Sequence, residues 1–490
     1  MHVALLIASI LILLCIFSSK ILYRFGVPSL LIFLILGMLM GSDGIGGVQF
    51  DNFDLAEYIS YIAIVIIIFY GGFGTKWDTA KPIAIKAGLM SSVGTITTAF
   101  IIGLLCVAIL RVSFLYGLLF GSVVASTDAA SVFSILRSRK LSLKNGLAPL
   151  LEIESGSNDP FAYMMTILVV SAISAQGASG QISNILLSFV AQIGVALVVS
   201  AVASFLTIAL LKHMYLQVPG LYPILLLAIV VLSFAICSLL GGNGLFCVYI
   251  LGLVVGNSKI IHKVSLVHFF DAISWLMQIM LFLTLGLLSF PSYLPKIIIP
   301  GTLLAVLLIF VARPLSTFAI LSWFKIPIKQ QIFVSWVGLR GAASIVFAIL
   351  AVKALGDTFP YDIFHLVFYV ALFSILIQGT LTPYMAKKLD VVDENEENSV
   401  MKTFTDYYEA THSKLLEYTI TDKDELVGKR VLETNMPENL LIIMIKRNGA
   451  VLIPRGGMLL KKNDLLVVSG NDFSFFDELK RNMSEYKKTQ

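Results

Sequence analysis

The chain has 490 residues, of which 58% are hydrophobic and only 13% are charged. Soluble globular proteins are roughly 45–50% apolar and about 25% charged. This composition excludes a mainly soluble protein and indicates that most of the chain lies in a lipid bilayer.

Charge divides the chain into two parts. Residues 1–388 contain 21 Lys+Arg and 12 Asp+Glu, whereas residues 389–490 contain 14 and 18. The long apolar runs all fall in the first part. We therefore predict a transmembrane domain over 1–388, an acidic linker over 389–413 and a small cytoplasmic domain over 414–490.

A membrane-spanning helix needs roughly 20 predominantly apolar residues. Thirteen stretches of this kind, two of them short, occur in the first part of the chain. They fall near 3–23, 28–41, 54–74, 82–110, 115–136, 147–174, 182–211, 220–240, 244–257, 265–289, 296–321, 330–353 and 362–386. The sequence therefore predicts an all-α polytopic membrane protein with about thirteen transmembrane helices.

The basic residues indicate the orientation. When alternate loops are assigned to one side of the membrane, that side holds sixteen Lys and Arg, and the other holds only Arg111, Lys296 and Lys353. Cytoplasmic loops carry an excess of Lys and Arg. We predict a multi-pass protein of the cytoplasmic (inner) membrane, with its N-terminus outside and its C-terminal domain in the cytoplasm.

Two spans share a short pattern of small residues, DAASV at Asp128–Val132 and GAASI at Gly341–Ile345. The two spans lie seven apart, so they cross the membrane in opposite directions, as inverted repeats of transporters do. Each pattern adjoins groups that a continuous span would avoid, Thr127-Asp128 in one and Gly338–Gly341 in the other. We predict inverted repeats whose two broken helices cross.

The sixth span carries a dense group of polar residues. Ser155 and Asp159 are four residues apart and share a helix face, with Asn158 beside them. Their oxygens suit an alkali cation, and the carboxylate also binds a proton. Because burial disfavours the charged carboxylate, Asp159 can exchange a proton for a cation near neutral pH. The alternative is a loop and helix cap before Pro160.

Thr127 and Asp128 are predicted to contribute to the same cation and proton site. An aspartate inside a broken helix can neutralise helix N-termini, and Thr127 can offer its hydroxyl or its carbonyl. The alternative for Asp128 is a helix N-cap without a ligand role, and both roles are compatible.

Glu154 needs a cationic partner, because an unpaired charge in lipid is costly. The only cations inside the predicted spans are Arg313 and Arg340. We predict a structural ion pair of Glu154 with Arg313, leaving Arg340 to compensate helix dipoles, and the pairing with Arg340 remains the alternative. Glu152 and Asp271 are predicted to be interfacial or paired.

Four motifs of the first part resemble the monovalent cation:proton antiporters of the NhaP/NHE type. They are Thr127-Asp128, ESGSND at Glu154–Asp159, Ala312-Arg313-Pro314 and GLRGA at Gly338–Ala342. The resemblance implies that Asp159 binds the cation and the proton, that the other polar residues of the first two motifs surround it, and that Glu154 pairs with an arginine of the eleventh span.

The same resemblance implies thirteen spans, a homodimer and an elevator-like movement of a core domain against a dimerisation domain. An asparagine before the aspartate, as at Asn158-Asp159, is associated in that family with electroneutral one-for-one exchange.

The C-terminal part is predicted to be a small α+β domain, with strands near 415–418, 440–446, 450–454 and 465–469 and a closing helix over 473–486. From about Lys414 to Met483 it resembles the C-terminal subdomain of RCK proteins, TrkA-C. The residues that match that subdomain are Gly428-Lys429, Ile445–Gly449, Pro454 and Asn463–Val467. It implies a small regulatory ligand, such as a cyclic dinucleotide, bound across a dimer. Because no glycine-rich nucleotide fingerprint precedes it, we expect no cofactor.

Together these features predict an antiporter that exchanges cytoplasmic K⁺ or Na⁺ for H⁺ by alternating access at Asp159. The RCK-type tail favours K⁺ by analogy, and a Na⁺/H⁺ antiporter of the same fold is the alternative. A channel gated by the tail is disfavoured, because no TVGYG-like filter is present. The sequence has no metal or nucleophile constellation, so we expect neither an enzyme nor catalytic residues, and no nucleic-acid partner.

Overall fold

In a computed structural model, the chain forms two compact units, Met1–Met401 and Lys402–Gln490. The structure describes residues 2–22, 29–139, 141–174, 181–260, 262–356, 362–393, 414–420, 424, 426–434, 436–437, 440–447, 450–470 and 475. Lys140, most of the predicted linker and most of the predicted closing helix over 473–486 therefore lie outside the described residues, as do Asn448 and Gly449 of the TrkA-C motif.

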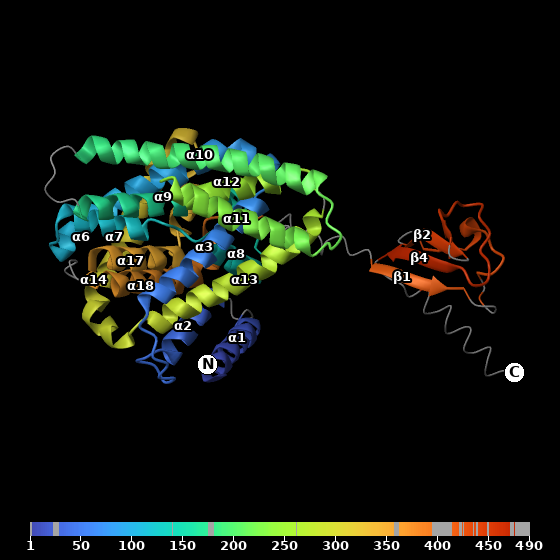
Figure 1. Cartoon of the computed structure of the whole chain (residues 1–490), viewed down its shortest axis with the longest axis horizontal. Helices are drawn as coiled ribbons and strands as arrows, with labels where there is room; N and C mark the ends of the chain where they lie inside the picture. The colour runs from blue at the N-terminus through green and yellow to red at the C-terminus, as the bar shows by residue number, and fades with distance from the viewer. Residues whose placement is uncertain are drawn as a thin grey trace. The chain divides into compact units, whose positions relative to one another are not determined.

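The described part of the first unit is built of helices (Figure 1). Their bounds are α1 His2–Leu22, α2 Ser29–Met40, α3 Phe53–Gly74, α4 Trp77–Ala80, α5 Ala84–Leu89, α6 Thr95–Leu110, α7 Phe114–Val124, α8 Ala129–Ser138, α9 Leu147–Ser174, α10 Gln181–His213, α11 Leu221–Leu239, α12 Gly244–Gly256, α13 Lys263–Leu288, α14 Leu294–Leu307, α15 Arg313–Leu321, α16 Ile328–Trp336, α17 Ala342–Leu355, α18 Ile363–Ser374 and α19 Thr380–Lys388.

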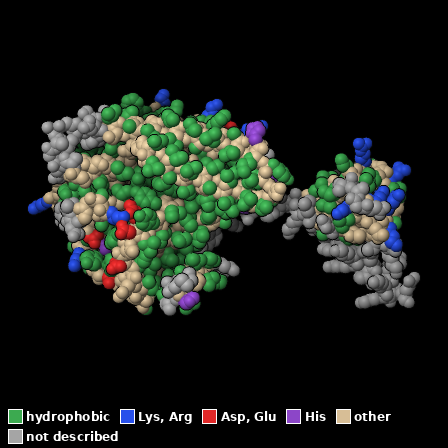
Figure 2. All heavy atoms as spheres, in the orientation of Figure 1, with side chains coloured by type: hydrophobic (Ala, Val, Ile, Leu, Met, Phe, Trp, Pro, Cys, Tyr) green, Lys and Arg blue, Asp and Glu red, His purple; other side chains and the backbone are tan. Residues whose placement is uncertain are grey.

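Each of the thirteen predicted windows coincides with a helix, or with several helical segments in succession. Among the described residues, eight helices are long and apolar enough to cross a membrane, and four further apolar helices are shorter. Apolar side chains cover most of the face of this unit that Figure 2 shows, as expected where lipid replaces water. The first unit is therefore a mostly helical membrane domain.

Two helical passages are interrupted where the sequence predicts it. The first break, residues 125–128, separates α7 from α8, and the second break, residues 337–341, separates α16 from α17. α9, by contrast, continues through Pro160 as one helix of 28 residues. The alternative of a loop before Pro160 is therefore wrong.

The described residues include three π-helical turns that the sequence analysis did not predict, at Met90–Gly94, Leu308–Ala312 and Ile375–Gly379. Such turns often occur at functional sites. The carbonyl of Gly94, in the first of them, accepts a hydrogen bond from Ser316 Oγ of α15 at 2.8 Å. The loosened backbone is thus satisfied by a neighbouring helix, as a membrane interior requires.

The second unit contains a four-stranded sheet with the order β1-β4-β2-β3. Its strands are β1 Lys414–Thr419, β2 Leu440–Arg447, β3 Ala450–Leu452 and β4 Leu465–Gly470, and all neighbours are antiparallel. The four predicted strands are present, although the third ends two residues earlier than predicted. Buried side chains of the sheet, among them Tyr418, Ile445 and Leu466, form the core of this unit.

A buried ion pair closes one end of this sheet. The Asp464 carboxylate is fully buried and accepts bonds of 2.7 Å from Arg447 Nε and Nη2 and one of 2.8 Å from the Lys461 backbone N–H. Burial alone would raise the pKa of Asp464, but these donors outweigh it and hold that pKa below its usual value.

We predict that Asp464→Asn loosens the sheet and removes much of its acid sensitivity. A carboxylate whose pKa is lower in the folded state stabilises the fold fully at pH values above its unfolded-state pKa. This stability is lost as the pH falls through the folded-state pKa. The cost at neutral pH should lie near the lower end of ~3–5 kcal/mol, because Arg447 is 23% exposed. Hydrogen exchange of the β2 and β4 amides in the full chain, followed over a range of pH, measures the loss of stability. An equal loss of protection at acid pH in the wild type and in Asp464→Asn would contradict the prediction.

Candidate ion-binding site

The two breaks contact each other inside the first unit. The backbone N–H of Asp128 donates to the carbonyl of Leu339 at 2.8 Å. Arg340 Nη1 donates to the carbonyls of Ala125 and Ser126 at 2.6 and 2.8 Å. These carbonyls lie at the C-terminal end of α7, so the buried guanidinium faces the negative end of a helix dipole.

Ser155 of α9 joins the first break to the rest of the site. Its hydroxyl donates to the carbonyl of Thr127 and accepts from the backbone N–H of Ala129, both at 2.7 Å. A serine hydroxyl has two acceptor lone pairs, so one remains for a further ligand. Ser155 thereby fixes the backbone on both sides of Asp128.

Asn158 and Asp159 face the same break. Asn158 Nδ2 donates to Thr127 Oγ1, and the Asp159 carboxylate accepts from Ser126 Oγ. The oxygen Asn158 Oδ1 is buried and accepts no hydrogen bond from any residue that the structure describes. Asp159 itself is half-buried, whereas Asn158 is only 1% exposed. Both side chains thus bond to the first break, and together they offer a carboxylate and an unsatisfied amide oxygen, which are donors that suit a hard cation.

Asp128 caps α8 from the first break. Its carboxylate accepts from the backbone N–H of Ser131 at 3.2 Å and from Ser131 Oγ at 2.6 Å. It also lies against the backbone of the second break, because a Cβ added at Gly341 would come within 2.6 Å of Asp128 Cβ and Oδ2. The N-cap role therefore holds, and it leaves carboxylate lone pairs free.

We predict that Gly341→Ala pushes the two breaks apart. The added methyl overlaps Asp128, so the substitution should cost about 1–3 kcal/mol and strongly reduce transport. Gly88→Ala in α5 is the matched control, since a Cβ there meets nothing within 4 Å. Thermal stability of the purified protein and vesicle transport measure the effect. Gly341→Ala behaving like the control in both assays would contradict the prediction.

Glu154 and Arg313 form a buried ion pair behind the site. Arg313 Nη2 donates to Glu154 Oε1, and the two side chains are 3% and 2% exposed. Of the two pairings that the sequence left open, the structure thus has the one with Arg313. Arg340 instead binds the carbonyls of the first break.

The remaining polar residues of the helices lie elsewhere. Asp271 of α13 accepts from Tyr70 OH of α3 at 2.9 Å, so it is hydrogen-bonded as expected. Glu152 is half-buried and also has a partner. In the described part of the chain, no cluster of three His, Cys, Asp or Glu residues could hold a metal ion.

Sequence reasoning missed two features of the site. Ser126 binds Asp159, and its only signal was its position directly before Thr127-Asp128. At the second break, the backbone N–H of Arg340 donates to Ser374 Oγ at 3.1 Å, and Ser374 is linked through Gln378 to the carbonyl of Trp336. Gln378 lies in a π-helical turn that no sequence pattern indicated.

Comparison with known proteins identifies the family of the helical unit. Residues 7–388 match the sodium/hydrogen exchanger transmembrane family. The chain belongs to this family. Its members are cation/proton antiporters, so the protein is a transporter and not an enzyme. Residues 415–474 match the TrkA-C domain, which makes the C-terminal unit of this antiporter a TrkA-C domain.

Individual relatives agree with this family assignment. The K(+)/H(+) antiporter NhaP of Alkalimonas amylolytica is 33% identical over 473 residues, which are 95% of this chain and 81% of the relative. K(+)/H(+) antiporter NhaP2 of Shewanella sp. (strain ANA-3) is 33% identical over 96% of this chain and 81% of the relative. The solved structure of the sodium proton antiporter MjNhaP1 from Methanocaldococcus jannaschii superposes with a TM-score of 0.68 at 23% identity, covering 79% of this chain and 99% of that one. Over the part that superposes, the antiporter thus has the fold of MjNhaP1.

Proposed function

We propose that this antiporter exchanges a monovalent cation of the cytoplasm for H⁺ across the bacterial inner membrane, with K⁺ as the preferred cation and Na⁺ as the alternative. Two relatives at 33% identity carry the name K(+)/H(+) antiporter, which supports K⁺. The TrkA-C domain supports the same choice by analogy.

The observation that carries this proposal is that the half-buried Asp159 and Asn158, whose amide oxygen is unsatisfied, both bond to the first break. A cation at Asp159 would take oxygen ligands from Asn158, Ser155, Thr127 and Asp128, and a proton would take the carboxylate alone. Since the two ligands compete for one charge, each excludes the other.

Coupling follows from the cost of a bare charge. An empty, ionised Asp159 would be an uncompensated carboxylate in the membrane, which is costly. The site therefore crosses only when loaded with a proton or a cation. Because either ligand carries one positive charge, the proposed exchange is one-for-one and electroneutral.

Glu154, Arg313 and Arg340 hold this site without touching the cation in our proposal. The buried Glu154–Arg313 pair neutralises both charges within one contact. Arg340 compensates the carbonyls at the end of α7. The charges of Glu154 and Arg313 cancel and Arg340 faces carbonyl dipoles, so in our proposal Asp159 is the group that titrates.

The proposed architecture has thirteen spans in inverted repeats, an outside N-terminus and a homodimer with an elevator-like core. Its proposed parts are the transmembrane domain over 1–388, the acidic linker over 389–413 and the TrkA-C domain over 414–490. The sixteen basic residues of one predicted side support the orientation. The contacts between the two breaks support crossed broken helices.

We further propose that the TrkA-C domain regulates exchange by binding a small ligand of the cyclic dinucleotide class across the dimer. Deleting Lys414–Gln490 should abolish the response of exchange to such a ligand and alter its response to pH, while exchange itself persists. An unchanged response to both in the truncated protein would remove this regulatory role.

Vesicles containing the purified protein test the transport function. After a pH gradient is imposed, K⁺, Na⁺ and Li⁺ are added separately, and the gradient is followed with a fluorescent dye. We expect K⁺ to dissipate the gradient fastest, with no current and no dependence on membrane voltage. Faster dissipation by Na⁺ would reassign the cation, and a cation current without proton movement would identify a channel instead.

A further inference from the structure

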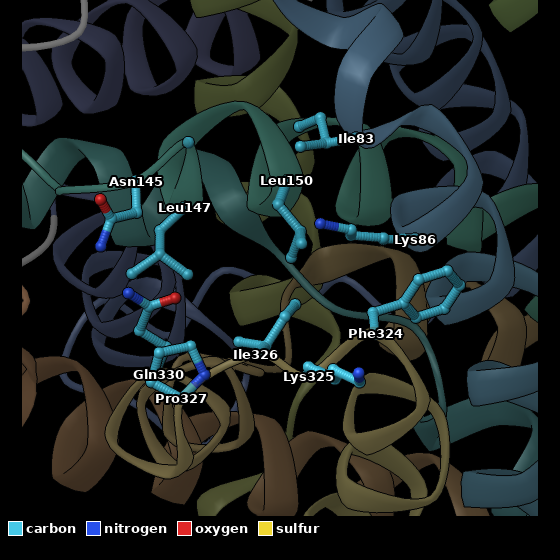
Figure 3. Close-up of a pocket in the computed structure, with 11 residues that line it drawn as sticks. Ile83, Lys86, Asn145, Leu147, Leu150, Phe324, Lys325, Ile326, Pro327 and Gln330 are labelled. Carbon is cyan, nitrogen blue, oxygen red and sulfur yellow. The ribbon is translucent and has the colours of Figure 1, made fainter.

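A pocket of about 250 Å³ is lined by none of the ion-binding residues (Figure 3). Three segments enclose it: α5, the turn that begins α9, and the connection from α15 to α16. Its polar side chains are Lys86, Asn145, Lys325 and Gln330. In Figure 3, Lys86 extends into the pocket from one side, and the amides of Asn145 and Gln330 lie on the other.

The pocket is positively charged. Its eleven lining residues include two lysines and no acid. Within the described part of the chain, neither Lys86 nor Lys325 forms an ion pair, and Lys86 Nζ instead lies 5.9 Å from the centre of the Phe324 ring. Two uncompensated ammonium groups repel cations, so the pocket is not an entrance for the transported ion. They attract an anion with several acceptor oxygens.

Apolar side chains place this pocket at the edge of the lipid. Ile85, Trp323 and Ile328 adjoin its lining residues in sequence and are 72%, 87% and 66% exposed. Exposed tryptophans are enriched at the headgroup level of membranes. A soluble anion would use only the lysines, whereas a lipid would also cover these three apolar side chains.

We propose that the pocket binds the headgroup of an anionic phospholipid. Lys86 and Lys325 contact the phosphate, the amides of Asn145 and Gln330 bind the polar headgroup, and the acyl chains lie over Ile85, Trp323 and Ile328. The lysines are among the basic residues predicted for the cytoplasmic side, so the lipid belongs to the cytoplasmic leaflet. The site joins α5, α9 and α16, and its occupant therefore ties together three segments of the helical unit.

This site is tested by measuring the thermal stability of the full-length protein in detergent with and without added lipid. Short-chain phosphatidylglycerol should raise the unfolding midpoint, because a ligand that binds the folded state stabilises it. Short-chain phosphatidylcholine and inorganic phosphate should raise it little or not at all. Each Lys→Gln substitution, Lys86→Gln or Lys325→Gln, should weaken the apparent affinity for phosphatidylglycerol about fivefold, and the double variant about 25-fold.

Lys212→Gln is the matched control, since it removes one exposed lysine from the same predicted side but outside the pocket. It should keep the wild-type response to phosphatidylglycerol. An equal response in the double variant would overturn the site, and so would the absence of any response in the wild type. If inorganic phosphate stabilised the protein as much as phosphatidylglycerol does, the proposal of a lipid ligand would be wrong and the pocket would bind a soluble anion. None of these readouts depends on transport, so the result is independent of the proposed function.

Discussion

Asp159→Asn is expected to reduce cation/proton exchange to the level of empty vesicles. The amide keeps the shape of the carboxylate and can still bond to Ser126, but it has no negative charge to balance a cation and no proton to exchange. Decay of an imposed pH gradient on addition of K⁺ measures the loss, with thermal stability recorded for the same preparation.

Asp271→Asn is the matched control for this substitution. Asp271 is also an aspartate within a helix of the membrane domain, but it bonds to Tyr70 and lies outside the contact of the two breaks. The control should retain exchange. Exchange that persists in Asp159→Asn, or that is lost equally in both variants, would contradict the role of Asp159.

Separating Glu154 from Arg313 is expected to destabilise the membrane domain severely. Each single change, Glu154→Leu or Arg313→Met, leaves one buried charge without its partner, at a cost of about 3–5 kcal/mol. The double variant removes both charges and should recover most of the lost stability, because an apolar pair of similar size often replaces a buried ion pair at little cost. Thermal unfolding midpoints of the purified variants measure the difference.

An exposed ion pair of the same unit provides the comparison. Lys144 and Asp390 are bonded at 2.9 Å with side-chain exposures of 33% and 73%, and exposed pairs contribute little to stability. Lys144→Gln should therefore leave the midpoint almost unchanged. If the single variants at Glu154 and Arg313 were equally harmless, or the double variant no better than the singles, the buried pair would not have the proposed role.

The positions of the helices and of both breaks could be predicted from the sequence, for a simple physical reason. Apolar length sets the spans, and polar groups such as Thr127-Asp128 inside them are costly unless the helix is interrupted. The choice of Arg313 over Arg340 was harder, because sequence spacing does not say which helices face each other. The structure distinguishes the two arginines by their partners, a carboxylate for one and backbone carbonyls for the other.

Features that depend on packing between distant segments could not be predicted. The spacing of Ser155 from Asp159 did not indicate that its hydroxyl also bonds to the backbone on both sides of Asp128. Helical periodicity gives the face of a residue but not what lies opposite it. The π-helical turns do not change the hydrophobic periodicity of the sequence. The hydrogen bond of Gln378 to the carbonyl of Trp336 could therefore not be predicted either.

The most direct measurement is a calorimetric titration of the purified protein with K⁺ over a series of pH values, with proton release recorded in parallel. Competition at one carboxylate predicts that the apparent Kd for K⁺ rises about tenfold for each unit of pH below the range in which Asp159 is ionised, and that each bound cation displaces a proton. A Kd independent of pH, or proton release that survives in Asp159→Asn, would mean that cation and proton do not share this carboxylate.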